Sequence, residues 1–148
     1  METETAPLTD GLTVRDFVPD DLPLLEHWWG HRHSDPFPLA LLPPLGVVIE
    51  DATGPVGMLW CYECFGVGVG FLEFPVTRPG LSVRKAGAVM EFAVTCCVRL
   101  AGKCVEPPAE VPFFRVFTPP PVARFLEGRG FQFCDFGQPV RGMIFHNH

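Results

Sequence analysis

The residues best suited to chemistry lie in one segment, residues 76–88, between a predicted strand and a predicted long helix. Basic and small side chains follow each other there, in the run Arg84, Lys85, Ala86, Gly87 and Ala88. A helix start exposes unpaired N–H groups and the positive end of the helix dipole. Small residues let a phosphate approach that backbone, and basic residues add charge. The segment therefore predicts an anion site, although an ordinary basic helix start that faces water has the same composition.

A carboxylate, Glu73, precedes this segment on the strand predicted for residues 67–76. A carboxylate placed beside a ligand site can act as a general base, directly or through a water molecule. Glu73 is therefore the candidate catalytic residue. The alternative is a carboxylate at a sheet edge or one that faces solvent, and the sequence leaves that choice open.

A Cys-x-x-Cys motif is formed by Cys61 and Cys64. Structural zinc sites commonly take thiolates from two such pairs, and no second pair is present in this sequence. Cys96 and Cys97 fall on different faces of the predicted long helix, so they are better explained as small buried hydrophobic residues. No metal site is predicted from the cysteines. A thiol or metal protein stays an alternative function that rests on Cys61 and Cys64.

Three histidines, His27, His31 and His33, lie close together in the sequence. Two histidines four residues apart on a helix can share a metal ion. Gly30 and the polar run after it predict that the helix ends between His27 and His31. The favoured interpretation is a solvated helix end, with no metal ligand assigned.

The elements that must position these residues follow from hydrophobic periodicity and turn chemistry. A hairpin is predicted around the turn at 51–54, and Gly102 predicts the end of the long helix. Residues 1–11 are expected to form a loose leader and residues 12–148 a single α/β domain, in the order β-α-β-β-β-α-β-α-β-β. A first helix is predicted to begin near Pro23, and the other elements are strands at 12–17, 45–50, 55–62, 67–76, 113–117, 131–136 and 140–145, a helical turn at 39–42, and helices at 84–101 and 119–128.

This order of motifs resembles the GCN5-related N-acetyltransferase (GNAT) superfamily, as a divergent member. The acyl-CoA loop of that family reads Arg or Gln, two residues, Gly, one residue, then Gly or Ala. Here Arg84, Gly87 and Val89 stand at those three positions, with valine in place of the small residue. Further segments similar to the family lie at 13–23, 54–59 and 123–131, so the resemblance covers residues 12–136.

The resemblance implies a mixed, mostly antiparallel sheet flanked by helices, with strands four and five splayed apart. The pantetheine arm of acetyl-CoA would pair with strand four like an added strand. Phe74, Val76 and Thr77 would line that arm, and residues 84–88 would hold the pyrophosphate. The implied activity is direct transfer of an acetyl group from acetyl-CoA to an amine. Leu126 stands where the family usually has a tyrosine acid, so the alternative is a degenerate member, a binding or interaction module without catalysis.

Composition and charge limit the partners and the cellular compartment that are expected. The net charge of −6 argues against general binding to nucleic acid or to an anionic membrane, both of which need a basic face. No apolar run reaches the length that spans a bilayer, and the first residues lack the pattern of a signal peptide. A cytoplasmic protein with reduced thiols is therefore expected. An exposed sheet edge is compatible with a homodimer, and the amine acceptor is not identified.

Overall fold

The structure of the chain is a computed structural model that describes residues 11–103, 105, 107–116, 124, 126–128 and 130–131. By its contacts the chain divides into two units, residues 1–115 and 116–148, and each is described by itself. In the second unit, residues 124 and 126–127 are helical, within the helix predicted at 119–128. Apart from residue 131, the strands predicted at 131–136 and 140–145 lie outside the described residues, as does the leader up to residue 10.

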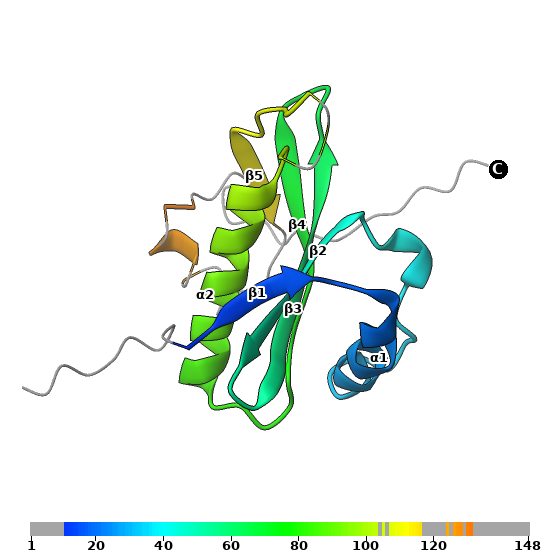
Figure 1. Cartoon of the computed structure of the whole chain (residues 1–148). Helices are drawn as coiled ribbons and strands as arrows, with labels where there is room; N and C mark the ends of the chain where they lie inside the picture. Colours follow the sequence, from blue (N-terminus) through cyan, green and yellow to red (C-terminus); the bar gives the residue numbers. More distant parts are fainter. Residues whose placement is uncertain are drawn as a thin grey trace, which may run out of the picture. The chain divides into compact units, whose positions relative to one another are not determined.

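Five strands form one sheet in the order β1-β2-β3-β4-β5, and neighbours in the sheet are also neighbours along the chain (Figure 1). The pairs β1–β2, β2–β3 and β3–β4 are antiparallel. This is the α/β fold with a mostly antiparallel sheet that the sequence predicts. The elements are β1 (Thr13–Asp16), η1 (Pro19–Asp21), α1 (Leu22–Gly30), η2 (Leu39–Leu41), β2 (Leu45–Asp51), β3 (Gly54–Cys64), β4 (Val69–Thr77), α2 (Val83–Leu100) and β5 (Phe113–Val116).

The helices α1 and α2 cover opposite faces of the sheet (Figure 1). On the α1 face, Leu25 and Trp28 are fully or almost fully buried in a cluster that includes Trp60 of β3. On the other face the backbone of β3 comes so close to α2 that a Cβ added at Gly57 would lie 2.4 Å from the Val89 side chain. Strand β3 is therefore covered on both sides, which explains its long apolar run.

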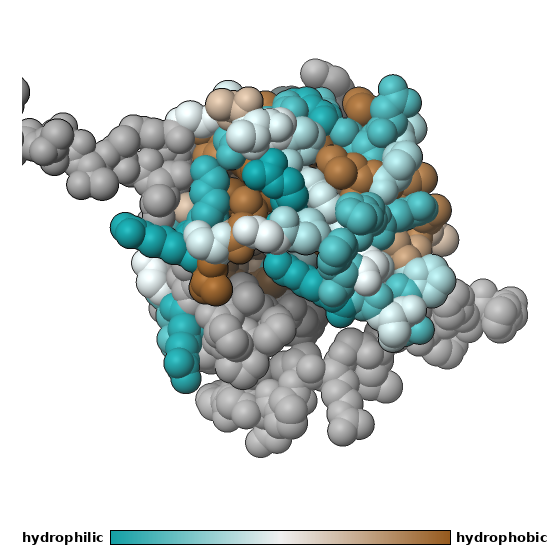
Figure 2. Space-filling model, turned by 90° about the horizontal axis from the view of Figure 1, so that it is seen from below, coloured by the Kyte–Doolittle hydropathy of each residue, from teal (hydrophilic) through white to brown (hydrophobic). Residues whose placement is uncertain are grey.

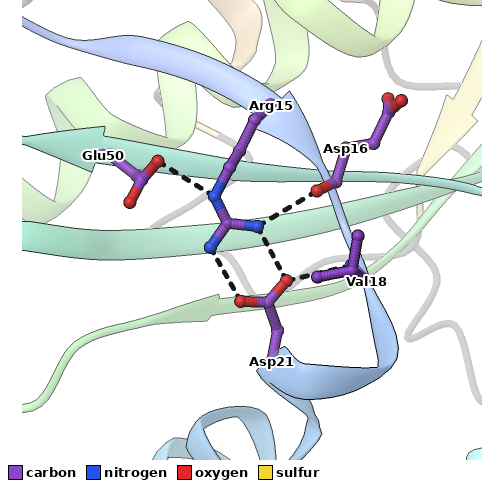
Figure 3. Close-up of polar contacts among 5 residues, drawn as sticks. All are labelled: Arg15, Asp16, Val18, Asp21 and Glu50. Carbon is purple, nitrogen blue, oxygen red and sulfur yellow. Dashed lines mark hydrogen bonds and ion pairs between the residues drawn. The ribbon is translucent and has the colours of Figure 1, made fainter.

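A charged cluster joins β1 to the start of α1 and to β2 (Figure 3). Arg15 donates from Nη1 and Nη2 to the carboxylate of Asp21, at 2.8 and 2.7 Å, and from Nε to Glu50 at 2.9 Å. The backbone N–H of Val18 donates to the same Asp21 carboxylate at 2.9 Å. Asp21 stands at the N-cap of α1. However, its side chain makes no cap hydrogen bond, because Arg15 and Val18 occupy it.

Helix α2 begins one residue before the predicted start and ends one residue before the predicted end. Gly102 follows with φ of +80°, and a Cβ there would lie 1.9 Å from the carbonyl oxygen of Ala109. Only glycine fits this left-handed position so close to another backbone. The predicted stop of the long helix at Gly102 is therefore confirmed.

Candidate functional site

Strands β4 and β5 lie side by side at the start of β4. The Phe113 N–H donates to the carbonyl of Gly68 at 3.3 Å, and a Cβ added at Gly70 would lie 2.8 Å from the Phe114 ring. Residue numbers rise together in these contacts, so the two strands run in the same direction at this point. Helix α2 connects them, as a parallel pair requires. Strand β4 continues beyond these contacts to Thr77.

A β-bulge interrupts β4 just beyond its contacts with β5. Met58 pairs with Val76 and Trp60 pairs with Glu73. The two pairs are two residues apart on β3 but three residues apart on β4, so β4 has one extra residue here. Phe74 lies inside this bulge and has φ of +56°, a left-handed conformation that costs a non-glycine residue about 1–2 kcal/mol. The bulge changes which way Phe74 faces, and bulges are over-represented next to active sites.

The bulge brings Phe74 onto the α1 face of the sheet. Its ring lies 5.4 Å from the Phe37 ring and 6.3 Å from the Trp29 ring, centroid to centroid, with edge-to-face geometry. Such aromatic pairs contribute about 0.5–1.5 kcal/mol each beyond their buried area. The packing of these rings therefore offsets the strained backbone and fixes the bulge in place.

Glu73 lies on the same face, because it pairs directly with Trp60, which belongs to the α1 cluster. The side chain is partly buried, and this burial raises the pKa of the Glu73 carboxyl above its ordinary value. Burial and the nearby Glu73 charge also raise the pKa of the Tyr62 hydroxyl. A carboxylate with a raised pKa accepts a proton more effectively near neutral pH. The role of Glu73 as a base stays a prediction.

The start of α2 has the features of an anion site. Ser82 is the N-cap, and its side chain accepts a hydrogen bond from the Lys85 N–H at 3.1 Å. Val83, the first helical residue, has 91% of its surface exposed, and Arg84 beside it is exposed as well. The first N–H groups of a helix have no partner within the helix, so those of Val83 and Arg84 are available to a ligand. The dipole makes this end attractive to a phosphate.

The remaining residues of the predicted 84–88 site are placed differently. The Ala86 N–H donates to the carbonyl of Ser82, and Gly87 and Ala88 follow it inside the helix. Their N–H groups therefore belong to the helical ladder. Gly87 still has an open side, because a Cβ added there would meet nothing within 4 Å. Ala88 is buried, with 7% of its surface exposed.

Lys85 points to a partner within the protein. Its Nζ lies 3.6 Å from Oδ2 of Asp51, in the turn between β2 and β3. The Arg78 Nη1 donates to Oγ1 of Thr53 in the same turn, at 2.9 Å. Hydrogen bonds from Thr53, and then the charges of Lys85 and Arg78, lower the pKa of Asp51. Asp51 therefore compensates part of the positive charge, and Arg84 is the better candidate for a phosphate contact.

This end of the molecule carries mostly hydrophilic side chains with hydrophobic ones between them (Figure 2). Among the predicted pantetheine residues, Val76 and Thr77 are each 4% exposed at the end of β4. The Thr77 hydroxyl accepts a hydrogen bond at 2.9 Å from Nη2 of Arg32, which follows α1. Sequence reasoning missed Arg32 because the two residues are 45 positions apart and no local pattern connects them.

The structure thus brings two predicted groups of residues to the same end of the first unit. Phe74, Val76 and Thr77 end β4, and after the short loop 78–82 the residues 84–88 begin α2. Glu73 stands just before the bulge on the same strand. Leu126 belongs to the second unit. The arrangement of Leu126 relative to this end of the molecule therefore stays a prediction.

The cysteines of the Cys-x-x-Cys motif point to opposite faces of β3, because they are three residues apart on one strand. Burial raises the pKa of Cys61 to about 12, and it also raises the pKa of Cys97 on α2. Such thiols stay protonated and are poor nucleophiles and metal ligands. Within the described residues, no group of three or more His, Cys, Asp or Glu side chains is arranged to hold a metal ion.

The histidines lie where the first helix ends. Helix α1 stops at Gly30, as predicted, and the rings of His27 and His31 meet edge to face at 4.9 Å between centroids. His33 stacks on Trp29 at 3.6 Å.

None of the helices in the described part of the chain is both long and apolar enough to cross a membrane.

The sequence matches no protein-family model and no curated protein. Solved structures do match over most of the chain. A GNAT-family acetyltransferase from Streptococcus pneumoniae aligns with a TM-score of 0.59 at 16% identity, covering 92% of this chain and 96% of that one. The ribosomal-protein-S18-alanine N-acetyltransferase from Escherichia coli aligns with a TM-score of 0.61 at 13% identity, covering 82% of this chain and 77% of that one.

A third similar structure was solved with coenzyme A. It is the N-acetylglutamate synthase from Neisseria gonorrhoeae, in complex with coenzyme A and N-acetyl-glutamate. The TM-score is 0.57 at 10% identity, and the match covers 86% of this chain and 30% of that one. These similarities show that the chain has the GNAT fold, as the sequence motifs predict. At such low identity the fold is what they establish, and the reaction has to be argued from the site.

Proposed function

We propose that this protein is an acyl-CoA-dependent N-acetyltransferase that moves an acetyl group from acetyl-CoA to an amine by direct transfer. One observation carries the proposal. A bulged strand with a partly buried carboxylate, Glu73, is followed ten residues later by a helix start whose first N–H groups have no partner within the helix, and by an exposed arginine, Arg84. The carboxylate suits the amine, and the helix start suits the pyrophosphate of the thioester donor.

The residues fit the donor as follows. Acetyl-CoA supplies the activated acetyl group, and the N–H groups of Val83 and Arg84 and the guanidinium of Arg84 would hold its pyrophosphate. The end of β4, at Phe74, Val76 and Thr77, would pair with the pantetheine arm. Lys85 contributes less than its charge suggests, because Asp51 is its partner.

Glu73 would remove a proton from the amine, directly or through water, as the amine nitrogen attacks the thioester carbon. The carbon–sulfur bond then breaks, and the coenzyme A thiolate takes a proton. Because the usual tyrosine position holds Leu126, water would provide that proton. A thiolate is a tolerable leaving group, so the loss of this acid slows the reaction without preventing it.

Thiol release from acetyl-CoA in the presence of a mixture of primary amines tests the proposal. We expect Glu73→Gln to lower the rate at least about 100-fold, the size of a general-base contribution. Glu26→Gln, at an exposed glutamate of α1, is the matched control and should keep the wild-type rate. A Glu73→Gln variant as active as the wild type would refute the assigned base.

The alternative is a module that keeps the fold and binds without catalysis. Leu126 in place of tyrosine favours it. This alternative predicts that acetyl-CoA binds but that no amine in the mixture releases a thiol. A cytoplasmic location and a homodimer also stay predictions from the sequence.

A further inference from the structure

The surroundings of Glu73 bear on which amine the enzyme accepts, and this step rests on the proposed function. A base must lie on the same side of the sheet as the amine from which it takes a proton. Glu73 lies on the α1 face, opposite Trp60. The acceptor therefore approaches β4 from the α1 face, at the bulge.

Aromatic side chains surround Glu73 on that face. The next cross-strand pair is Tyr62 with Phe71, and both share the face of Trp60 and Glu73 because each is two residues away on its strand. Directly opposite and diagonal neighbours in a sheet are within reach of each other's side chains. Phe74, turned onto this face by the bulge, follows on the other side of Glu73.

The Trp60 ring is directed toward β2 and not toward Glu73. The Trp60 ring lies over Gly46 of β2, since a Cβ added at Gly46 would be 2.3 Å from its Nε1 atom. The ring is therefore directed away from β4, and it is only 1% exposed. In contrast, Glu73, Tyr62 and Phe71 are all partly exposed, so they can meet a bound molecule.

The two cross-strand pairs, Trp60–Glu73 and Tyr62–Phe71, hold one charged residue. Glu73 is the only carboxylate in the two cross-strand pairs, and the Arg115 guanidinium lies 5.8 Å from the centre of the Phe71 ring. One negative charge among rings suits a single ammonium group, which aromatic faces also attract. A polyamine needs several carboxylates, and these two cross-strand pairs hold one.

We infer that the acceptor is a primary monoamine that carries an aromatic or bulky apolar group next to its amine. Its ammonium group would meet Glu73, and its apolar part would lie against Phe71, Tyr62 and Phe74. Polyamines and small polar amines match these surroundings poorly. The substrate class thus follows from the rings around the base.

Three probes separate these classes: phenethylamine, spermidine and ethanolamine, each assayed by thiol release from acetyl-CoA. We expect kcat/KM for phenethylamine to exceed that for the other two about tenfold, the scale of a partly exposed ring contact. Phe71→Ala should lower this preference at least threefold, and Tyr62→Phe, which keeps the ring, should retain it. Phe65→Ala, at an exposed phenylalanine of the β3–β4 turn, is the control and should leave the preference unchanged.

Each outcome is decisive. Equal or better use of spermidine or ethanolamine by the wild type would overturn the inference and leave the proposed function standing. An unchanged preference in Phe71→Ala would do the same. If no acetyl-CoA binds, the proposed function itself fails, and calorimetry with acetyl-CoA alone distinguishes that case.

Discussion

The bulge at Phe74 sets the geometry of the candidate site, and a pair of substitutions tests it. Phe74→Ala and Phe74→Gly both remove the ring that packs against Phe37 and Trp29. A fully buried phenylalanine loses about 3–5 kcal/mol on truncation to alanine, so about 2 kcal/mol is expected for this partly buried one. The two variants differ only in the Cβ atom and in backbone freedom.

The sign of the difference between them depends on the backbone. In a regular strand, glycine is less stable than alanine by about 0.5–1 kcal/mol. At φ of +56° the alanine Cβ instead costs about 1–2 kcal/mol. Phe74→Gly should therefore be more stable than Phe74→Ala by about 0.5–1 kcal/mol.

Urea unfolding of both variants at equal protein concentration measures this difference. A thermal scan should place the glycine variant about 1–4 °C above the alanine variant. If alanine is the more stable residue at this position, β4 is regular here, and the arrangement of Glu73 and Phe74 on one face is wrong.

Three further predictions concern other parts of the molecule. Arg15→Met should lower the free energy of unfolding by about 2 kcal/mol, because it leaves Asp21 without its main partner in a cluster that solvent partly screens. Because Arg15 lowers the pKa of Asp21, this stabilisation of the wild type is complete above the unfolded pKa of 3.8 and is lost as the pH falls below it. Acid unfolding of the Arg15→Met variant should lack this loss. Gly46→Ala should cost about 1–3 kcal/mol in urea unfolding, because its Cβ would meet the buried Trp60 ring, and an unchanged midpoint would contradict that packing. The rate of acetyl transfer should rise with pH as Glu73 loses its proton, at a pKa raised above the ordinary 4.5. If the Glu73→Gln variant shows the same rise of rate with pH, another group is responsible for it.

Much of the fold is local in origin, and the sequence predicts it for that reason. The β2–β3 turn has its own turn residues, and α2 has helical periodicity, a serine cap and a terminal glycine. These signals need no knowledge of distant residues. The predicted bounds of α2 are accordingly within one residue of the observed ones.

The site depends on contacts that no local pattern encodes. The bulge carries Phe74 at a positive φ, where a sequence reader looks for glycine, and only its packing against Phe37 and Trp29 explains it. The pairing of Lys85 with Asp51 joins residues 34 positions apart and changes which basic residue is available. The hydrogen bond from Arg32 to Thr77 likewise joins residues that are far apart in the sequence.

The central claim is that the start of α2 binds the pyrophosphate of acetyl-CoA, and calorimetry with acetyl-CoA tests it most directly. Arg84→Ala should weaken binding about tenfold, which corresponds to about 1.4 kcal/mol. Lys85→Ala should weaken it less, because Asp51 is the partner of Lys85. Arg99→Ala, at an exposed arginine in the last turn of the same helix, is the matched control and should bind like the wild type. No binding by the wild type at millimolar acetyl-CoA, or equal binding by the Arg84→Ala variant, would contradict this site.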